Sequence, residues 1–176
     1  MRTGVIVAIV AGVLALGVVA FAVVQSRDNN GSTGASGSTD TGGLPPSIGG
    51  QPLLEGDVAD AFKNLMDAYA GQGLAASGIY GSATRPEYMY LVLDTDIPPG
   101  LSGETFLRAT AHVAGYPIKG GYVQGSDGDT HVTCAPYGSP GVSSMCFVAA
   151  GDTPAMAIGF HASADEALQD ILESDI

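Results

Sequence analysis

Hydrophobic and polar positions follow three different patterns along the chain. Residues 4–24 form an unbroken run of 21 residues without a charge. Residues 25–50 contain almost no apolar side chains and show no period, whereas residues 51–176 alternate between apolar stretches and short polar or glycine-rich turns. The pattern predicts a transmembrane signal anchor over residues 1–24, a flexible linker over residues 25–50 and one folded domain over residues 51–176.

The amino-terminal apolar run is long enough to cross a membrane. At a rise of about 1.5 Å per residue, a helix of this length covers the roughly 30 Å hydrocarbon core of a bilayer. Arg2 before the run and Arg27 beside Asp28 after it make the positive-inside rule a weak guide. A very short tail before an apolar run is typical of a chain whose carboxyl end is exported, so we expect a single-pass protein of the cell membrane with a cytoplasmic amino terminus and the domain outside. The alternative is a secreted domain, released by cleavage after the A-x-A pattern that ends at Ala22. Since the run continues to Val24, beyond the usual length of a signal-peptide core, the anchor is favoured.

The predicted linker is rich in Gly, Ser and Thr and has Pro45-Pro46 near its end. Such a segment behaves as a flexible coil, and one of this length reaches roughly 25–30 Å. We therefore expect the domain to stand away from the membrane and to rotate freely.

Three helices are predicted in the domain from their caps and apolar periods. Asp57 can begin the first helix, which runs through Tyr69, and Ser102 can begin the second, which Gly115 ends. Ser163 begins the third, with Glu166 three residues later to complete a capping box. The apolar faces of the three helices are, in order, Val58, Phe62, Leu65, Met66 and Tyr69; Phe106, Leu107, Thr110 and Val113; and Ala164, Leu168, Ile171 and Leu172.

The strand pattern indicates an antiparallel sheet. Residues 86–94 alternate with apolar side chains on both faces, which predicts a strand that is covered on both sides, and residues 77–81 are a shorter candidate. Asp127-Gly128 is a strong signal for a hairpin between two of the four later strands. Those strands are expected at about 118–124, 130–137, 142–150 and 154–161. The fold class is therefore α+β, with an antiparallel sheet and helices mainly on one face.

The two cysteines lie in one predicted hairpin. Cys134 and Cys146 are equally far from Pro140, the centre of a Gly-Ser-Pro-Gly turn, so they face each other across the two strands. Export would supply an oxidising compartment, which favours a structural disulfide. A metal site or a reactive thiol is the alternative, but the C-x11-C spacing matches no zinc motif and C-x-x-C is absent.

The cysteine hairpin, followed by a short apolar step, Thr153 and a last helix, resembles a group of uncharacterised membrane-anchored extracytoplasmic proteins of actinobacteria. They share an anchor or signal, a Gly/Ser/Thr linker and a compact domain that ends in a cysteine hairpin, a strand and a helix. The similarity covers mainly residues 134–176. In that group C-x-W-x-D often follows the second cysteine, whereas here Cys146 leads to Val148 and Ala150. The resemblance implies a location outside the membrane and no particular activity.

The net charge of −12 belongs entirely to the predicted domain. Residues 1–50 carry two arginines and two aspartates, which cancel, so residues 51–176 hold sixteen acids against four basic residues. Such a domain is repelled by nucleic acid and by anionic lipid headgroups, so we expect no nucleic-acid partner. A basic partner or cations would be attracted, although solubility alone also explains an acidic surface.

No catalytic or cofactor motif is present. The histidines His112, His131 and His161 have no metal-ligand spacing, and Asp127 and Asp129 lack the further oxygen ligands of a calcium loop. There is no G-x-S-x-G elbow and no phosphate-binding loop. We therefore expect no catalytic residues, no metal and no cofactor.

Tyrosines are the candidate binding residues. Tyr88, Tyr90, Tyr122 and Tyr137 lie in or beside predicted strands and would form a recognition surface if they gathered on one exposed sheet face. The alternative is ordinary packing within the sheet.

Two functions are open on these grounds. The favoured hypothesis is a membrane-tethered, non-catalytic binding domain for an extracytoplasmic protein or cell-wall partner. The alternative is a cell-envelope enzyme or accessory factor with a site built from dispersed histidine and acidic residues. An exposed tyrosine patch would favour binding, and a cleft that joins a histidine to two carboxylates would favour catalysis.

Overall fold

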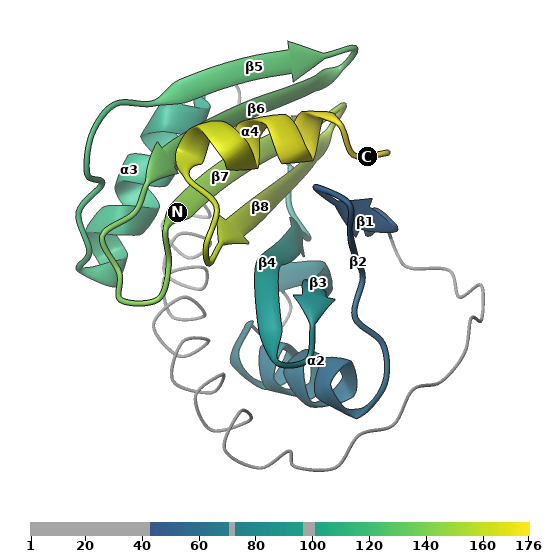
Figure 1. The fold of residues 1–176 in the computed structure, drawn as a ribbon. Coiled ribbons are helices and arrows are strands. Elements are labelled where there is room, and N and C mark those ends of the chain that lie inside the picture. The colour runs from purple at the N-terminus through teal and green to yellow at the C-terminus, as the bar shows by residue number, and fades with distance from the viewer. Residues whose placement is uncertain (1–42, 71–72, 97–100) are drawn as a thin grey trace.

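The computed structural model describes residues 43–70, 73–96 and 101–176. Within these ranges, a six-stranded antiparallel sheet with the strand order β3-β4-β8-β7-β6-β5 is packed against three helices, and two short strands form a separate hairpin (Figure 1). The elements are β1 (Ser47–Ile48), β2 (Gln51–Pro52), α2 (Asp57–Ala70), β3 (Leu74–Ser82), β4 (Arg85–Leu93), α3 (Gly103–Ala114), β5 (Val123–Asp127), β6 (Thr130–Pro136), β7 (Ser144–Ala150), β8 (Thr153–Gly159) and α4 (Ala164–Leu172). The predicted α+β class with an antiparallel sheet is confirmed.

The predicted anchor and most of the predicted linker lie outside the described residues. Among the residues that are described, none of the helices is both long and apolar enough to span a bilayer.

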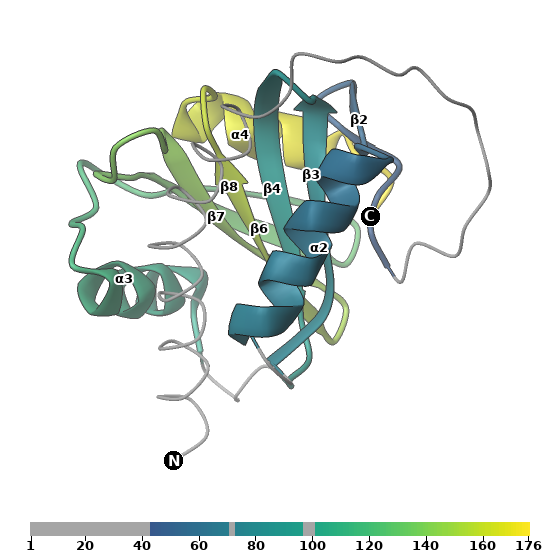
Figure 2. The ribbon, with the colours of Figure 1, turned by 90° about the horizontal axis from the view of Figure 1, so that it is seen from below.

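Both faces of the sheet are covered, as the alternation in β4 predicted. Met89 and Leu91 belong to the hydrophobic cluster under α2 and α3, whereas Tyr88 and Tyr90 belong to the cluster under α4. Figure 2 shows α2 and α3 on one side of the sheet and α4 on the other. The helices are therefore divided two to one between the faces, so the expectation of helices mainly on one face misses the layer that α4 forms.

The predicted caps of the last two helices are confirmed. The Ser102 side chain accepts a hydrogen bond from the Thr105 backbone N–H, and Gly115 ends α3 in the left-handed conformation. At α4, the Ser163 side chain accepts from the Glu166 backbone N–H and the Glu166 side chain accepts from the Ser163 backbone N–H. This capping box fixes where α4 begins, and with it the position of its acidic first turn.

All the predicted strands are present, but β3 is longer than the expected residues 77–81, and the largest difference lies near residues 118–124. There Ile118 makes only an isolated bridge with Tyr137, and β5 begins at Val123. Gly120 and Gly121 separate the two, and Gly120 has a φ of 119°, which a regular strand does not accommodate. The strand is therefore interrupted at the glycines and resumes five residues later than expected.

The predicted disulfide is confirmed. Cys134 and Cys146 are register partners in the β6–β7 pair, with an S–S distance of 2.03 Å and a Cα–Cα distance of 4.0 Å. Both are fully buried in the cluster under α4. The bond therefore joins two adjacent central strands of the sheet directly beneath that helix.

The folded domain begins earlier than residue 51, which corrects the predicted end of the linker. Residues 44–54, which we call the strap, contain the β1–β2 hairpin, and Ile48 in it is fully buried in the cluster under α4. The Leu54 N–H donates to the Ile79 carbonyl at the edge of β3, at 2.8 Å. One buried isoleucine in a Gly/Pro/Ser-rich stretch is too weak a pattern to separate from linker sequence.

Candidate functional site

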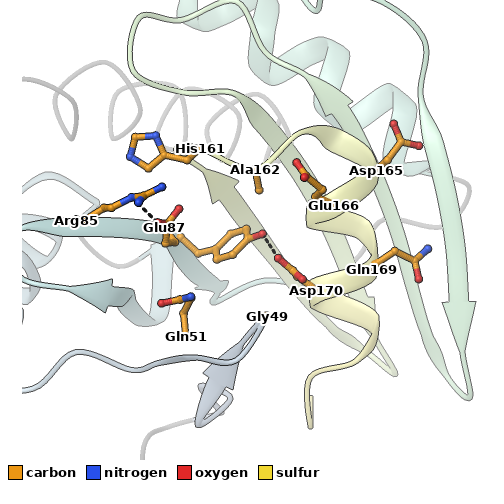
Figure 3. A pocket seen from close by; sticks show the side chains of 11 residues that line it. Gly49, Gln51, Arg85, Glu87, His161, Ala162, Asp165, Glu166, Gln169 and Asp170 are labelled. Carbon is orange, nitrogen blue, oxygen red and sulfur yellow. Dashed lines mark hydrogen bonds and ion pairs between the residues drawn. The ribbon is translucent and has the colours of Figure 1, made fainter.

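A cleft of about 550 Å³ lies where the strap, the start of β4 and α4 meet (Figure 3). The strap contributes Gly49 and Gln51 to its lining. The remaining lining residues are Arg85, Glu87 and Tyr88 from β4, His161 and Ala162 from the loop before α4, and Asp165, Glu166, Gln169 and Asp170 from α4. Three segments that are distant in the sequence therefore build one polar cleft.

Tyr88 and Asp170 connect the sheet to α4 at the base of the cleft. The Tyr88 hydroxyl donates a hydrogen bond to Oδ2 of Asp170, and Tyr88 is only 2% exposed. Burial raises the pKa of Tyr88 well above its ordinary value, and the hydrogen bond and negative charge of Asp170 raise it further. Tyr88 therefore stays protonated at physiological pH and serves as a fixed hydrogen-bond donor.

Glu166 is held in its ionised form by the capping box. Its Oε2 accepts from the Ser163 backbone N–H at 2.8 Å and from the Ser163 hydroxyl at 2.7 Å. These hydrogen bonds to the charged form lower the pKa of Glu166 below its ordinary value. The mouth of the cleft thus carries a permanent negative charge at neutral pH.

An ion pair forms the opposite wall. Arg85 Nε lies 2.8 Å from Glu87 Oε1, and the Glu87 side chain is only 18% exposed whereas that of Arg85 is 71% exposed. Figure 3 places Arg85 and His161 on the side opposite the carboxylates of α4. Since Glu87 neutralises Arg85, the carboxylates of α4 leave the cleft with an excess of negative charge.

A second hollow of about 700 Å³ adjoins the cleft. The two share His161, Asp165 and Glu166, so they meet around the first turn of α4. Lys119 and the β6–β7 turn line the far side of the second hollow. The surface around the α4 amino terminus is therefore concave on both sides of His161.

The tyrosines that were predicted to bind do not form a surface. Tyr88, Tyr90 and Tyr137 are 2%, 1% and 5% exposed, and Tyr122 is partly buried. Tyr88 and Tyr90 lie in the cluster under α4, whereas Tyr122 and Tyr137 lie with the cluster on the opposite face. Tyr88 and Tyr90 are two residues apart on β4 and therefore share a face, so the sheet separates them from the other two. The alternative of sheet packing applies, and only Tyr88 reaches the cleft.

The three histidines stay apart. His112 is exposed on α3 and His131 on β6, and only His161, which is also exposed, lies at the cleft. Across residues 43–70, 73–96 and 101–176, no group of three or more His, Cys, Asp or Glu side chains is arranged to hold a metal ion. The exposed Asp127 and Asp129 flank the β5–β6 turn.

Sequence reasoning did not single out Arg85, Glu87 or Asp170. One local signal existed, because Glu166 and Asp170 are four residues apart and therefore share a face of α4. The contact between Tyr88 and Asp170 joins residues 82 positions apart, and nothing in the local pattern indicates it.

Comparison with known proteins found no match among protein-family models, curated proteins or solved structures. The function of the cleft is therefore inferred from its own geometry and charge.

Proposed function

We propose that this chain is a non-catalytic binding domain, held at the outer side of a membrane by residues 4–24, and that the α4 cleft is its ligand site. The cleft itself carries this proposal, because it is an open polar concavity whose hydrogen-bonding groups are held in place by the fold. Tyr88, Glu166 and the Arg85–Glu87 pair all have fixed partners. Such preorganised groups suit recognition, since little ordering is needed when a ligand binds.

The charge of the cleft supports a ligand with positive groups. Glu87, Asp165, Glu166 and Asp170 line it against one permanently cationic side chain, Arg85. The rest of the domain adds to this field, because its acids outnumber its basic residues sixteen to four. A negative concavity attracts cationic partners and speeds their association.

The pKa shifts restrict the acid–base roles of two residues of the cleft. Tyr88 has a raised pKa and cannot act as a base at neutral pH, and Glu166 has a lowered pKa and cannot act as an acid. The two cysteines are joined in the buried disulfide and offer no nucleophile.

A second candidate function has one observation in its favour. His161 shares the cleft with several carboxylates, which is the arrangement a hydrolytic enzyme or accessory factor would need. Among the residues drawn in Figure 3, however, the marked interactions join Arg85 to Glu87 and Tyr88 to Asp170, and none involves His161. A general base is normally positioned by such a bond, so binding remains the better supported function.

Crosslinking on intact cells tests the proposal, with pull-down through a carboxyl-terminal tag and mass spectrometry. The cleft variant is His161→Ala combined with Asp165→Ala, and the matched control is His131→Ala combined with Asp129→Ala. All four side chains are exposed, so both variants should fold. We expect one dominant partner with the wild type and the control, and its loss with the cleft variant.

A partner that is captured equally by both variants would place the binding surface elsewhere and contradict the proposal. Capture of no specific protein by the wild type, together with hydrolysis of a cell-wall polymer that His161→Ala abolishes, would establish the second function instead. Cell fractionation with sequencing of the mature amino terminus tests the anchor. Membrane-bound protein that keeps residues 1–24 is expected, and soluble protein beginning after Ala22 would overturn it.

A further inference from the structure

One wall of the cleft is formed by the strap. Gly49 and Gln51, at the turn of the β1–β2 hairpin, line the cleft, and Gly49 contacts Asp170 of α4. The strap overlaps the end of the predicted linker and is the first part of the folded domain. The same eleven residues therefore connect the domain to the preceding chain and form part of the candidate site.

The base of the strap, residues 44–46 and 53–54, is held more firmly than its tip, residues 47–52. Near β3, the Tyr80 hydroxyl donates to the Pro45 carbonyl at 2.9 Å, and Leu53 bridges to Tyr80. At the tip, Ile48 is buried in the cluster under α4, Gln51 and Pro52 lie beside β3, and the Gly49 N–H donates a 3.4 Å hydrogen bond to the Asp170 carbonyl. Two strands of two residues each add little to this, so the tip has far fewer bonds than the sheet.

Asp170 makes the contact between α4 and the tip. Its carbonyl accepts from Gly49, and its carboxylate, which is fixed by Tyr88, fills the space beside the Gly49 Cα. A Cβ on Gly49 would overlap that carboxylate, whereas a Cβ on Gly50 would meet nothing within 4 Å. Both glycines have a positive φ, of 56° and 71°. The contact with α4 therefore depends on the absence of a side chain at Gly49 alone.

We propose that residues 47–52, the tip of the strap, are a latch that opens as a unit from α4 and thereby removes one wall of the cleft. The hinge is the base of the strap, residues 44–46 and 53–54, which is bonded to β3. The biological meaning of this opening rests on the proposed function, since it assumes that the cleft binds a ligand, but the opening itself requires no ligand.

Hydrogen exchange on the full chain in detergent micelles tests the opening. In the wild type, the amide of Gly49 should exchange at least about tenfold faster than those of β6 and β7, which open only with the whole sheet. Gly49→Ala should raise exchange in the tip by a further factor of about ten or more and leave β6 and β7 unchanged. Gly50→Ala is the matched control, because it introduces the same backbone strain without touching Asp170.

A cysteine reporter tests whether opening exposes the cleft. Glu87→Cys places a thiol on the cleft wall, while the native cysteines remain buried in their disulfide. Maleimide should label this thiol several times faster when Gly49→Ala is added than when Gly50→Ala is added. Equal rates would show that the tip moves without opening the cleft and would refute the coupling. Tip amides that exchange as slowly as those of β6 and β7 in the wild type would refute the latch itself, whatever partner crosslinking finds.

Discussion

The disulfide between Cys134 and Cys146 should supply a large share of the stability of this domain. It closes a loop with a sequence separation of 12. In the chain-entropy description, a link of that size raises the free energy of the unfolded state by about 3 kcal/mol. A single domain is typically stable by only about 5–15 kcal/mol, so reduction should remove a substantial part of the total.

Reduction of the wild type isolates the link better than substitution does. Both cysteines are fully buried among the side chains under α4, so replacing them also removes packing atoms. Serine would bury unsatisfied hydroxyl groups there, which alone costs about 1–3 kcal/mol each. Reduction keeps both sulfur atoms in place, and the seven register pairs of β6 and β7 remain to hold the strands together.

Urea unfolding of the full chain, with and without reductant, measures the contribution. We expect the midpoint to fall on reduction by an amount that corresponds to about 3 kcal/mol, with little change in slope. The double variant Cys134→Ala/Cys146→Ala is the control and should not respond to reductant. A difference below about 1 kcal/mol would refute the chain-entropy reasoning. Free thiols in protein purified without reductant would refute the disulfide itself.

Three further predictions follow from single side chains. Ile48→Ala should lower the free energy of unfolding by about 2–5 kcal/mol, because it empties a fully buried site. Ile176→Ala, at a 38% exposed position, should change it little, and equal effects of the two in urea unfolding would contradict the prediction. Tyr88→Phe should lower it by about 1–3 kcal/mol, because Asp170 loses its donor, and an unchanged urea midpoint would argue against that hydrogen bond. Because the pKa of Glu166 is lowered, its charged form stabilises the fold above the ordinary pKa of 4.5, and this contribution is lost as the pH falls through the folded pKa. The stability difference between wild type and Glu166→Ala should therefore shrink in acid. A constant difference in pH-dependent thermal unfolding would contradict this.

Local features of the fold were predictable because their causes are local. Ser102 and Ser163 begin helices because their side chains bond to backbone groups three residues away. The disulfide was predictable because the register of a hairpin follows from its turn, and Pro140 marks that turn. The two faces of β4 followed from the period of two in residues 86–94.

The candidate site was not predictable, because its causes are distant in the sequence. The cleft exists because the strap crosses to α4 and because Tyr88 meets Asp170, and both contacts join residues far apart in the chain. The prediction of a tyrosine surface was wrong for a related reason. Strand propensity indicates that a tyrosine favours a sheet, but it does not indicate whether a helix covers that tyrosine. Ile48 was missed because one apolar residue makes no period.

The disulfide and the latch lie on the same face of the sheet, and whether the disulfide affects opening of the latch can be tested. The buried residues of α4 pack in the same cluster as both cysteines and Ile48. If the disulfide acts through the unfolded chain alone, reduction should lower the stability of the whole domain and leave exchange in the tip of the strap unchanged, because the tip opens without unfolding β6 or β7. If reduction instead speeds exchange in the tip while the sheet remains folded, the disulfide must also hold α4 in position, and the cleft would be rigid on the α4 side only while Cys134 and Cys146 are joined.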